Sequence, residues 1–315
     1  MKISVVTPVY NEAKSLPRLV EEVTAALTPL GEYEILLVDD GSKDDTYDTL
    51  ERIAKKDKRL KVLSLRANRG QTAALMAGID HARGDVVVTI DSDLENDPAD
   101  IPRLVKKLEE SGADIVSGWR KDRWQDHFFT RRLPSAIANR LISRISKLSL
   151  HDHGCTLKAY RRGVLEDVAL YGDMHRFIAA YLSWRGARVV ELPVAHRPRL
   201  YGRSNYGIGR TLRVLLDLVV IKFFNTYLNR PIHFFGGLGL VSLALGFLAG
   251  AAAIVLRLLN IRHFVETPLP TLSALFIIVG VELVLMGVLA EMLTRIYYET
   301  RGKRTYTLKK TLNLP

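Results

Sequence analysis

Strand-like and helix-like segments alternate through the first half of this 315-residue chain, and this alternation limits the folds that it can adopt. The strand-like segments are short, apolar and rich in β-branched residues, whereas the segments between them repeat apolar residues at helical spacing. The strands are predicted at 3–7, 35–39, 61–65, 86–91 and 114–117, and the helices at about 13–27, 45–56, 71–82 and 98–110. Such an order predicts an α/β domain with a mostly parallel sheet that helices cover on both faces.

Acidic residues follow three of these predicted strands. The first strand runs into Glu12, the second into the sequence DDGS at 39–42, and the fourth into DSD at 91–93. Parallel strands place their carboxyl ends at one edge of a sheet, so we expect these acids to converge there. Clustered carboxylates repel one another unless a cation lies between them, and Mg²⁺ or Mn²⁺ binds through few carboxylates together with substrate phosphates. Helix charges and turns explain each acid taken alone, but their convergence favours a nucleotide with a metal-bound diphosphate.

Two long apolar runs occupy the last third of the chain. They cover about 233–256 and 269–294, and each is long enough to cross a hydrocarbon core as a helix. The connector at 257–268 is short, so we expect a transmembrane hairpin. Basic residues flank both outer ends, which places these ends and the large domain on the cytoplasmic side. Two buried helices of a soluble domain are the alternative.

The segment before the first apolar run predicts a helix that lies on the membrane surface. Within 209–229, apolar residues are interrupted by Arg213, Asp217 and Lys222, a mixture typical of interfacial helices. An amphipathic core helix is the alternative. The predicted organisation is a cytoplasmic catalytic domain at 1–207, an interfacial helix at 208–231, a hairpin at 232–294 and a basic cytoplasmic tail at 295–315.

The composition favours a membrane protein with an anionic partner. The net charge is +11, and much of the excess lies beside the apolar runs. We find no nucleic-acid-binding motif, so a phospholipid surface and a phosphorylated substrate are favoured over nucleic acid. The N-terminus does not have the pattern of a signal peptide. The single cysteine, Cys155, fits a reducing compartment and is expected to be a small buried residue.

Five sequence blocks together resemble a known family. They are TPVYNE at 7–12, VDDGS at 38–42, DSDLENDP at 91–98, HDHGCTLKAYRR at 151–162 and HRPRLYGRSNY at 196–206. The chain resembles the inverting GT-A glycosyltransferases of family 2. Within that family it is most similar to the polyprenyl-phosphate glycosyltransferases, the group of dolichol-phosphate mannose synthase and the bacterial undecaprenyl-phosphate sugar transferases. The blocks occur in the expected order before a membrane hairpin, so the resemblance covers essentially the whole chain and implies a Rossmann-like GT-A domain.

The resemblance also implies roles for particular residues. It implies a nucleotide pocket lined by Pro8, Tyr10, Glu12, Val38, Asp39, Asp40, Ser92, Arg199 and Arg203. Arg199 would bind phosphate near the donor. The family usually has a lysine at the position of Asn205, and Arg203 would supply the positive charge that is missing there. Asp91 and Asp93 would hold Mg²⁺ or Mn²⁺ with the diphosphate. Glu95 stands where the family commonly has glutamine, and this extra carboxylate is a further candidate metal ligand.

The acceptor that the resemblance implies is a polyprenyl monophosphate. Such a phosphate is already anionic near neutral pH, so its oxygen attacks the anomeric carbon without a protein base. It needs cations instead, and arginine suits this task because its planar group binds phosphate oxygens in pairs. The resemblance points to Arg120, Arg131 and Ser135 for this phosphate.

Two other functions remain open from the sequence. A membrane glycosyltransferase that acts on a saccharide hydroxyl would need a general base, for which Asp152 is the candidate. A catalytically inactive partner in a membrane complex is the third possibility, against which the retained acids and arginines argue. No residue selects the sugar, and similarity to the bacterial members favours UDP as the nucleotide. Small residues on the apolar runs permit a homo-oligomer.

Overall fold

The structure, a computed structural model, describes residues 1–121, 143, 148–166, 168, 170, 174–198, 231–299 and 306–314. The chain divides into two compact units. One consists of Met1–Ile221 together with Arg304–Pro315, and the other is Lys222–Lys303. The interfacial helix predicted at 208–231 falls outside the described residues except for its last position.

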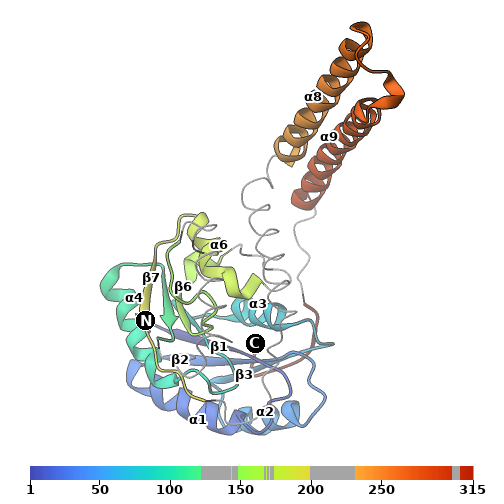
Figure 1. Cartoon of the computed structure of the whole chain (residues 1–315). Helices are drawn as coiled ribbons and strands as arrows, with labels where there is room; N and C mark the ends of the chain where they lie inside the picture. The colour runs from blue at the N-terminus through green and yellow to red at the C-terminus, as the bar shows by residue number, and fades with distance from the viewer. Residues whose placement is uncertain are drawn as a thin grey trace. The chain divides into compact units, whose positions relative to one another are not determined.

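A mixed sheet forms the centre of the first unit (Figure 1). In chain order its strands are β1 Ile3–Val9, β2 Tyr33–Asp39, β3 Leu60–Leu65, β4 Val86–Thr89, β5 Ile115–Trp119, β6 Lys158–Arg161, β7 Val189–Pro193 and β8 Leu308–Leu312. Their order across the sheet is β7-β5-β6-β4-β1-β2-β3-β8. Of these strands, β6 and β8 run antiparallel to their neighbours and the other six are parallel. The predicted mostly parallel α/β sheet is confirmed.

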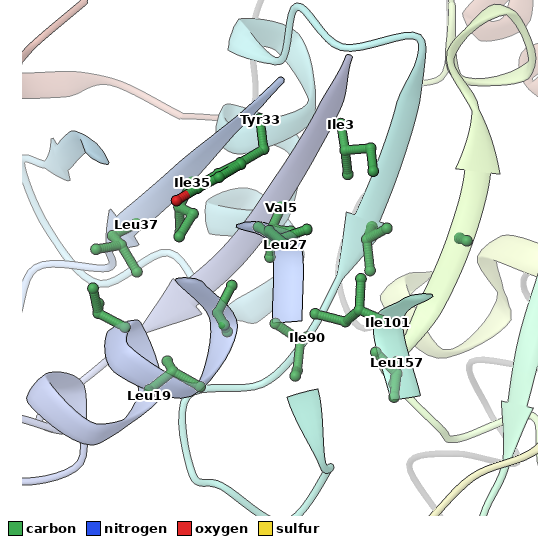
Figure 2. Packing of buried hydrophobic residues seen from close by; sticks show 14 of the residues in the cluster. Ile3, Val5, Leu19, Leu27, Tyr33, Ile35, Leu37, Ile90, Ile101 and Leu157 are labelled. Carbon is green, nitrogen blue, oxygen red and sulfur yellow. The ribbon is translucent and has the colours of Figure 1, made fainter. Parts of the chain in front are cut away.

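Helices cover both faces of this sheet. They are α1 Leu16–Leu27, α2 Thr46–Ala54, α3 Gln71–His81, α4 Ile101–Ser111 and α6 Ile178–Trp184, with short 3₁₀ turns at η2 Pro98–Asp100 and η5 Met174–Phe177. Successive side chains of a strand point to opposite faces. Val5 therefore joins a core with α1, α2 and α4, whereas Val6 joins a second core with α3 and α6. Figure 2 shows the first core, in which Val5 of β1 clusters with Leu27 of α1 and Ile101 of α4.

The helix α3 packs unusually closely on the sheet. A Cβ atom at Gly78 would lie 2.2 Å from Cγ1 of Val6 and 3.2 Å from Cγ2 of Val38, so only glycine fits there without a shift. This close packing fixes α3 against β1 and β2. It thereby fixes the first residue of the helix, Gln71, near the carboxyl ends of those strands.

The second unit contains two long apolar helices, α8 Pro231–Leu258 and α9 Leu269–Glu299. Both are long and apolar enough to cross a membrane. Small residues let them pack together: a Cβ at Gly239 would lie 2.8 Å from the carbonyl oxygen of Gly280, and Ser242 donates a hydrogen bond to the carbonyl of Phe276 at 2.8 Å. Large apolar side chains such as Leu248 of α8 and Leu289 of α9 are exposed, unlike those of helices buried in a soluble core. The predicted pair of apolar helices is confirmed.

Candidate active site

The carboxyl ends of β1, β2 and β4 meet at one edge of the sheet. Strand β1 lies between the other two, with Val9 opposite Asp39 in β2 and Val6 opposite Thr89 in β4. The segments that follow these strands therefore share this edge: 10–12, 40–42 and 91–95. Three further residues predicted for the pocket lie at the same edge. Pro8 of β1 pairs with Val38 of β2, one residue before the ends of these strands, and buried Ser92 belongs to the segment after β4.

The loops after β1 and β2 are tied together by hydrogen bonds. The backbone N–H of Asn11 donates to Ser42 Oγ at 3.0 Å, and that of Glu12 donates to Thr46 Oγ1 at 2.9 Å. Asn11 has a positive φ of 54°, which is uncommon outside glycine and marks a constrained turn. Beside these loops lies an open groove of about 800 Å³, lined by Asn11, Glu12, Ala13, Lys14, Asp44, Asp45, Asp48, Thr49 and Arg52.

Asp39 and Asp40 are both buried and both hold loops. Asp39 accepts hydrogen bonds from the backbone N–H of Ser42 at 2.9 Å and from Ser64 Oγ at 2.9 Å. Asp40 accepts from the backbone N–H groups of Arg69 at 2.8 Å and Gly70 at 2.9 Å. Burial and the neighbouring charge of Asp39 raise the pKa of Asp40 despite these bonds. The loop between β3 and α3 is thus attached to the carboxyl end of β2.

Asp91 receives one hydrogen bond on each of its carboxylate oxygens. Gln71 Nε2, at the start of α3, donates to Oδ1 at 2.7 Å, and Thr156 Oγ1 donates to Oδ2 at 2.7 Å. Burial, followed by the charge of Asp93, raises the pKa of Asp91 to about 6. These two donors fix the orientation of the carboxylate. Sequence reasoning did not single them out, although Thr156 lies inside a recognised block.

The backbone after Asp91 is constrained. Asp93 Oδ1 accepts a hydrogen bond from the N–H of Glu95 at 3.1 Å, and Leu94 between them has a φ of 61° while its side chain is buried. A leucine in the left-handed region is sterically costly, and such residues concentrate at functional sites. The side chains of Asp93 and Glu95 are therefore presented by a turn that the surrounding structure holds in place.

Arg197 anchors this turn from outside. Its backbone N–H donates to the carbonyl of Glu95 at 2.8 Å, and its guanidinium pairs with Glu22 of α1 and with Asp97, both at 2.6 Å. The segment after β7 therefore runs beside the residues that follow β4. Sequence reasoning assigned no role to Arg197, although it stands two residues before Arg199 in the same block.

Arg120 follows β5 and makes a buried ion pair with Asp152. Its Nε lies 2.7 Å from Asp152 Oδ2, and its Nη2 lies 3.1 Å from Oδ1. The positive charge of Arg120 lowers the pKa of Asp91 and so opposes the rise that burial causes. The guanidinium therefore stabilises the ionised form of this carboxylate. The same pairing engages both oxygens of Asp152, the alternative general base. Buried Lys158 donates to the carbonyl oxygens of His153 and Cys155, which holds the loop between Asp152 and Thr156.

The donor set at this edge fits a divalent metal bound jointly with phosphate. Within the described ranges, no group of three or more His, Cys, Asp and Glu side chains is arranged to hold an ion. Mg²⁺ and Mn²⁺ commonly use one or two carboxylates and complete their shell with water and substrate oxygens. Asp91 and Asp93 can supply that pair, and Glu95 stands beside them. Four predicted residues, Arg131, Ser135, Arg199 and Arg203, lie outside the described part of the chain.

Comparisons with known proteins identify the family and the fold of this chain. Residues 4–169, just over half of the chain, match the family Glycosyl transferase family 2. The crystal structure of glucosyl-3-phosphoglycerate synthase from Mycobacterium tuberculosis, in complex with Mn²⁺, UDP and phosphoglyceric acid, is similar with a TM-score of 0.54. That match is 20% identical and covers 71% of this chain and 78% of that one, and it shows the shared GT-A fold.

Two relatives match nearly the whole chain. A dodecaprenyl-phosphate galacturonate synthase of Rhizobium johnstonii is 41% identical over 98% of this chain and 93% of its own length. An undecaprenyl-phosphate 4-deoxy-4-formamido-L-arabinose transferase of Klebsiella pneumoniae is 38% identical over 100% of this chain and 94% of its own. The chain therefore belongs to glycosyl transferase family 2, in the branch that contains these polyprenyl-phosphate glycosyltransferases.

Proposed function

We propose that this glycosyltransferase moves a sugar from a UDP-linked donor to a polyprenyl monophosphate at the cytoplasmic face of a membrane, with inversion at the anomeric carbon. The observation that carries the proposal is the joint match, over nearly the whole chain, to two relatives named for transfer to dodecaprenyl and undecaprenyl phosphate. The acidic sheet edge and the two apolar helices support it, because the reaction needs a diphosphate site and a membrane-bound acceptor.

In this proposal the donor lies across the carboxyl ends of β1, β2 and β4. Pro8, Tyr10, Glu12, Val38, Asp39, Asp40 and Ser92 form the walls of the nucleotide pocket, with Arg199 and Arg203 on the phosphates. Asp91 and Asp93 hold Mg²⁺ or Mn²⁺, with Glu95 as a further candidate ligand. When bound, this ion neutralises charge that develops on the departing diphosphate. The hydrogen bonds from Gln71 and Thr156 keep Asp91 oriented while the donor binds.

The acceptor phosphate attacks without a protein base. Its oxygen forms a bond to the anomeric carbon, while the bond from that carbon to the diphosphate breaks and UDP leaves with the electron pair. Arg120, Arg131 and Ser135 are proposed to hold the phosphate and to offset its repulsion from the donor. Transfer to a saccharide hydroxyl is less well supported, because both oxygens of Asp152 are engaged by Arg120.

The membrane segment brings the acceptor to the site. Helices α8 and α9 are proposed to span the bilayer as a hairpin, with the catalytic domain on the cytoplasmic side. Confining enzyme and lipid to one surface raises the effective concentration of the acceptor.

A comparison of two acceptors tests this function. Purified full-length protein in detergent receives Mn²⁺, undecaprenyl phosphate and a panel of UDP- and GDP-linked hexoses, uronic acids and 4-amino-pentoses, and mass spectrometry reports the lipid product. Undecaprenol, which lacks only the phosphate, is the matched control. We expect a product from undecaprenyl phosphate with one donor, and nuclear magnetic resonance should show the inverted anomer. Transfer to undecaprenol, or retention of configuration, would contradict the proposal.

A further inference from the structure

The C-terminal residues 306–314, within the segment predicted as a basic cytoplasmic tail at 295–315, pack on the catalytic domain. We call residues 306–314 the strap. Its strand β8 pairs antiparallel with β3, with Leu63 opposite Thr311 and Ser64 opposite Lys310. Leu308 and Leu312 pack against the two opposite cores of the domain. The strap therefore forms one edge of the sheet that carries the candidate site.

Both ends of the strap are fastened by side chains. Tyr306 is buried, and its hydroxyl donates a hydrogen bond to Asp80 Oδ2 of α3 at 2.8 Å. At the other end, Asn313 Nδ2 donates to the carbonyl oxygens of Ala54 and Leu60, each at 2.8 Å, and so joins the end of α2 to the start of β3. Asn313 has a φ of 58°, a conformation that asparagine tolerates better than most residues.

Between these fastenings the strap holds the loop that connects β3 to α3. The backbone N–H of Arg66 donates to the carbonyl of Thr307 at 3.0 Å, and Arg66 Nε donates to the carbonyl of Leu308 at 3.4 Å. The strap thus fixes the first residue of this loop, while Tyr306 fixes the helix into which the loop runs.

The same loop holds the proposed nucleotide pocket on its other side. Its Arg69 and Gly70 N–H groups bind the two oxygens of Asp40. It also passes so close to Gly41 that a Cβ there would lie 2.8 Å from the backbone of Ala67 and Asn68. The loop is therefore held on one side by the strap and on the other by Asp40 at the end of β2. A shift of the loop at the strap would disturb its hydrogen bonds to Asp40.

We propose that the strap is a positioning element for the donor nucleotide, in which Tyr306 and the backbone of Thr307 set the β3–α3 loop that orients Asp40, while Asn313 fastens the other end of the strap to the start of β3. This inference rests on the proposed function in so far as Asp40 lines the donor pocket. Because the strap follows α9 in the chain, the residues that leave the second apolar helix also complete the catalytic domain.

The test uses the full-length protein in detergent and compares the double variant Tyr306→Phe/Asn313→Gly with Lys309→Ala. The double variant removes the two side-chain fastenings, and glycine keeps the backbone conformation of residue 313. Lys309 is exposed on the same strand and serves as the matched control. Titration calorimetry with UDP and with GDP, in the presence of Mn²⁺, measures nucleotide affinity. Hydrogen exchange at residues 66–70 measures how firmly the loop is held.

The proposal expects two linked changes. Exchange at 66–70 becomes faster in the double variant, and the Kd for the nucleotide that the wild type binds rises about five- to tenfold. In transfer assays, KM for the donor rises while kcat and KM for the acceptor stay within about twofold, a split that general unfolding would not produce. Lys309→Ala behaves as wild type. The single variant Tyr306→Phe, which removes the fastening next to the loop, is the substitute if the double variant does not fold.

Two results separate the failure of this inference from the failure of the proposed function. If exchange at 66–70 is unchanged in the variants, or if it accelerates while nucleotide affinity stays at the wild-type value, the strap does not position the donor. If the wild-type protein itself binds neither UDP nor GDP, the proposed function is wrong, and with it the role of the strap toward a nucleotide.

Discussion

Two hydrogen-bond donors, Gln71 and Thr156, hold the carboxylate of Asp91 in its orientation. The hydrogen bond from Thr156 can be removed by a substitution that keeps the shape of the side chain. Thr156→Val keeps the size of the side chain and loses the hydroxyl that donates to Asp91 Oδ2 at 2.7 Å. Residues that orient a metal-binding carboxylate commonly affect metal affinity or activity by about 10- to 100-fold. We expect about a tenfold rise in the Mn²⁺ concentration needed for half-maximal transfer. A metal dependence equal to that of the wild type would show that Thr156 has no such role.

His153 gives the folded protein a defined sensitivity to acid. Burial, with the nearby charge of Lys158, lowers its pKa to about 4 from the ordinary 6.5, although Asp152 opposes the shift. Between these two values the unfolded chain binds more protons than the folded one, so stability falls as the pH drops from 6.5 toward 4. The loss of melting temperature between pH 7 and pH 5 should therefore be smaller in His153→Gln than in the wild type. Parallel losses in both proteins would contradict this assignment.

The contacts of single residues also mark the limit of prediction from sequence. The acids Asp40, Asp91 and Asp93 stand out because they follow recognisable strands. The donors that hold Asp91 do not stand out, since Gln71 and Thr156 lie 20 and 65 residues away along the chain. Only the folded sheet brings such distant side chains together. The metal and nucleotide roles of the acids remain predictions until binding is measured.

At the scale of elements, the sequence predicted those strands and helices whose own residues show a clear apolar or helical repeat. The five strands and four helices predicted in the first half all occur, with bounds that differ by a few residues. The strands β6, β7 and β8 were not predicted. Of these, β6 and β8 are short and contain lysines at 158, 309 and 310, so their local sequence does not indicate a strand. Lys158 is buried only because β6 inserts between β4 and β5, and such tertiary placement leaves no local signal.

The position of α3 gives a prediction at this scale. Gly78 allows the helix to approach β1, and Gly78→Val would place new carbon atoms where the side chain of Val6 already lies. Overpacking of this kind costs about 1–3 kcal/mol and shifts the backbone. We expect a lower melting temperature together with weaker Mn²⁺-dependent UDP binding, because Gln71 moves with the helix. Thr24→Val, on α1 at the opposite face, is a comparison that should not weaken UDP binding. Wild-type stability in Gly78→Val would refute the close packing.

At the scale of the whole molecule, the chain leaves the catalytic domain before α8 and returns to it with β8 after α9. If the two helices span a bilayer, both of their outer ends are on the side of the catalytic domain, and the connector between them is on the other side. Sequence predicted the hairpin from its apolar runs and basic flanks. The return to the sheet could not be predicted, because it depends on pairing between β3 and a strand about 250 residues later.

Labelling of single cysteines tests this arrangement in intact cells. Val265→Cys lies in the connector, where the side chain is fully exposed, and Lys309→Cys lies on the strap. The native Cys155 is buried and its pKa is raised by burial, so it should not react with a thiol reagent. A membrane-impermeant maleimide should label Val265→Cys from outside, and Lys309→Cys only after the cells are opened. Labelling in the reverse pattern would overturn the proposed orientation.

The central claim is that the acids after β4 hold a metal-bound diphosphate during transfer to a lipid phosphate. The most direct test measures the polyprenyl-phosphate sugar formed by the wild type with Mn²⁺, by the wild type with EDTA, and by Asp93→Asn with Mn²⁺. Glu110→Gln on α4 is the control for loss of an exposed acid. We predict product from the wild type and the control with Mn²⁺, none with EDTA, and a rate at least about 100-fold lower in Asp93→Asn. Equal product in the presence of EDTA, or from Asp93→Asn, would contradict the account.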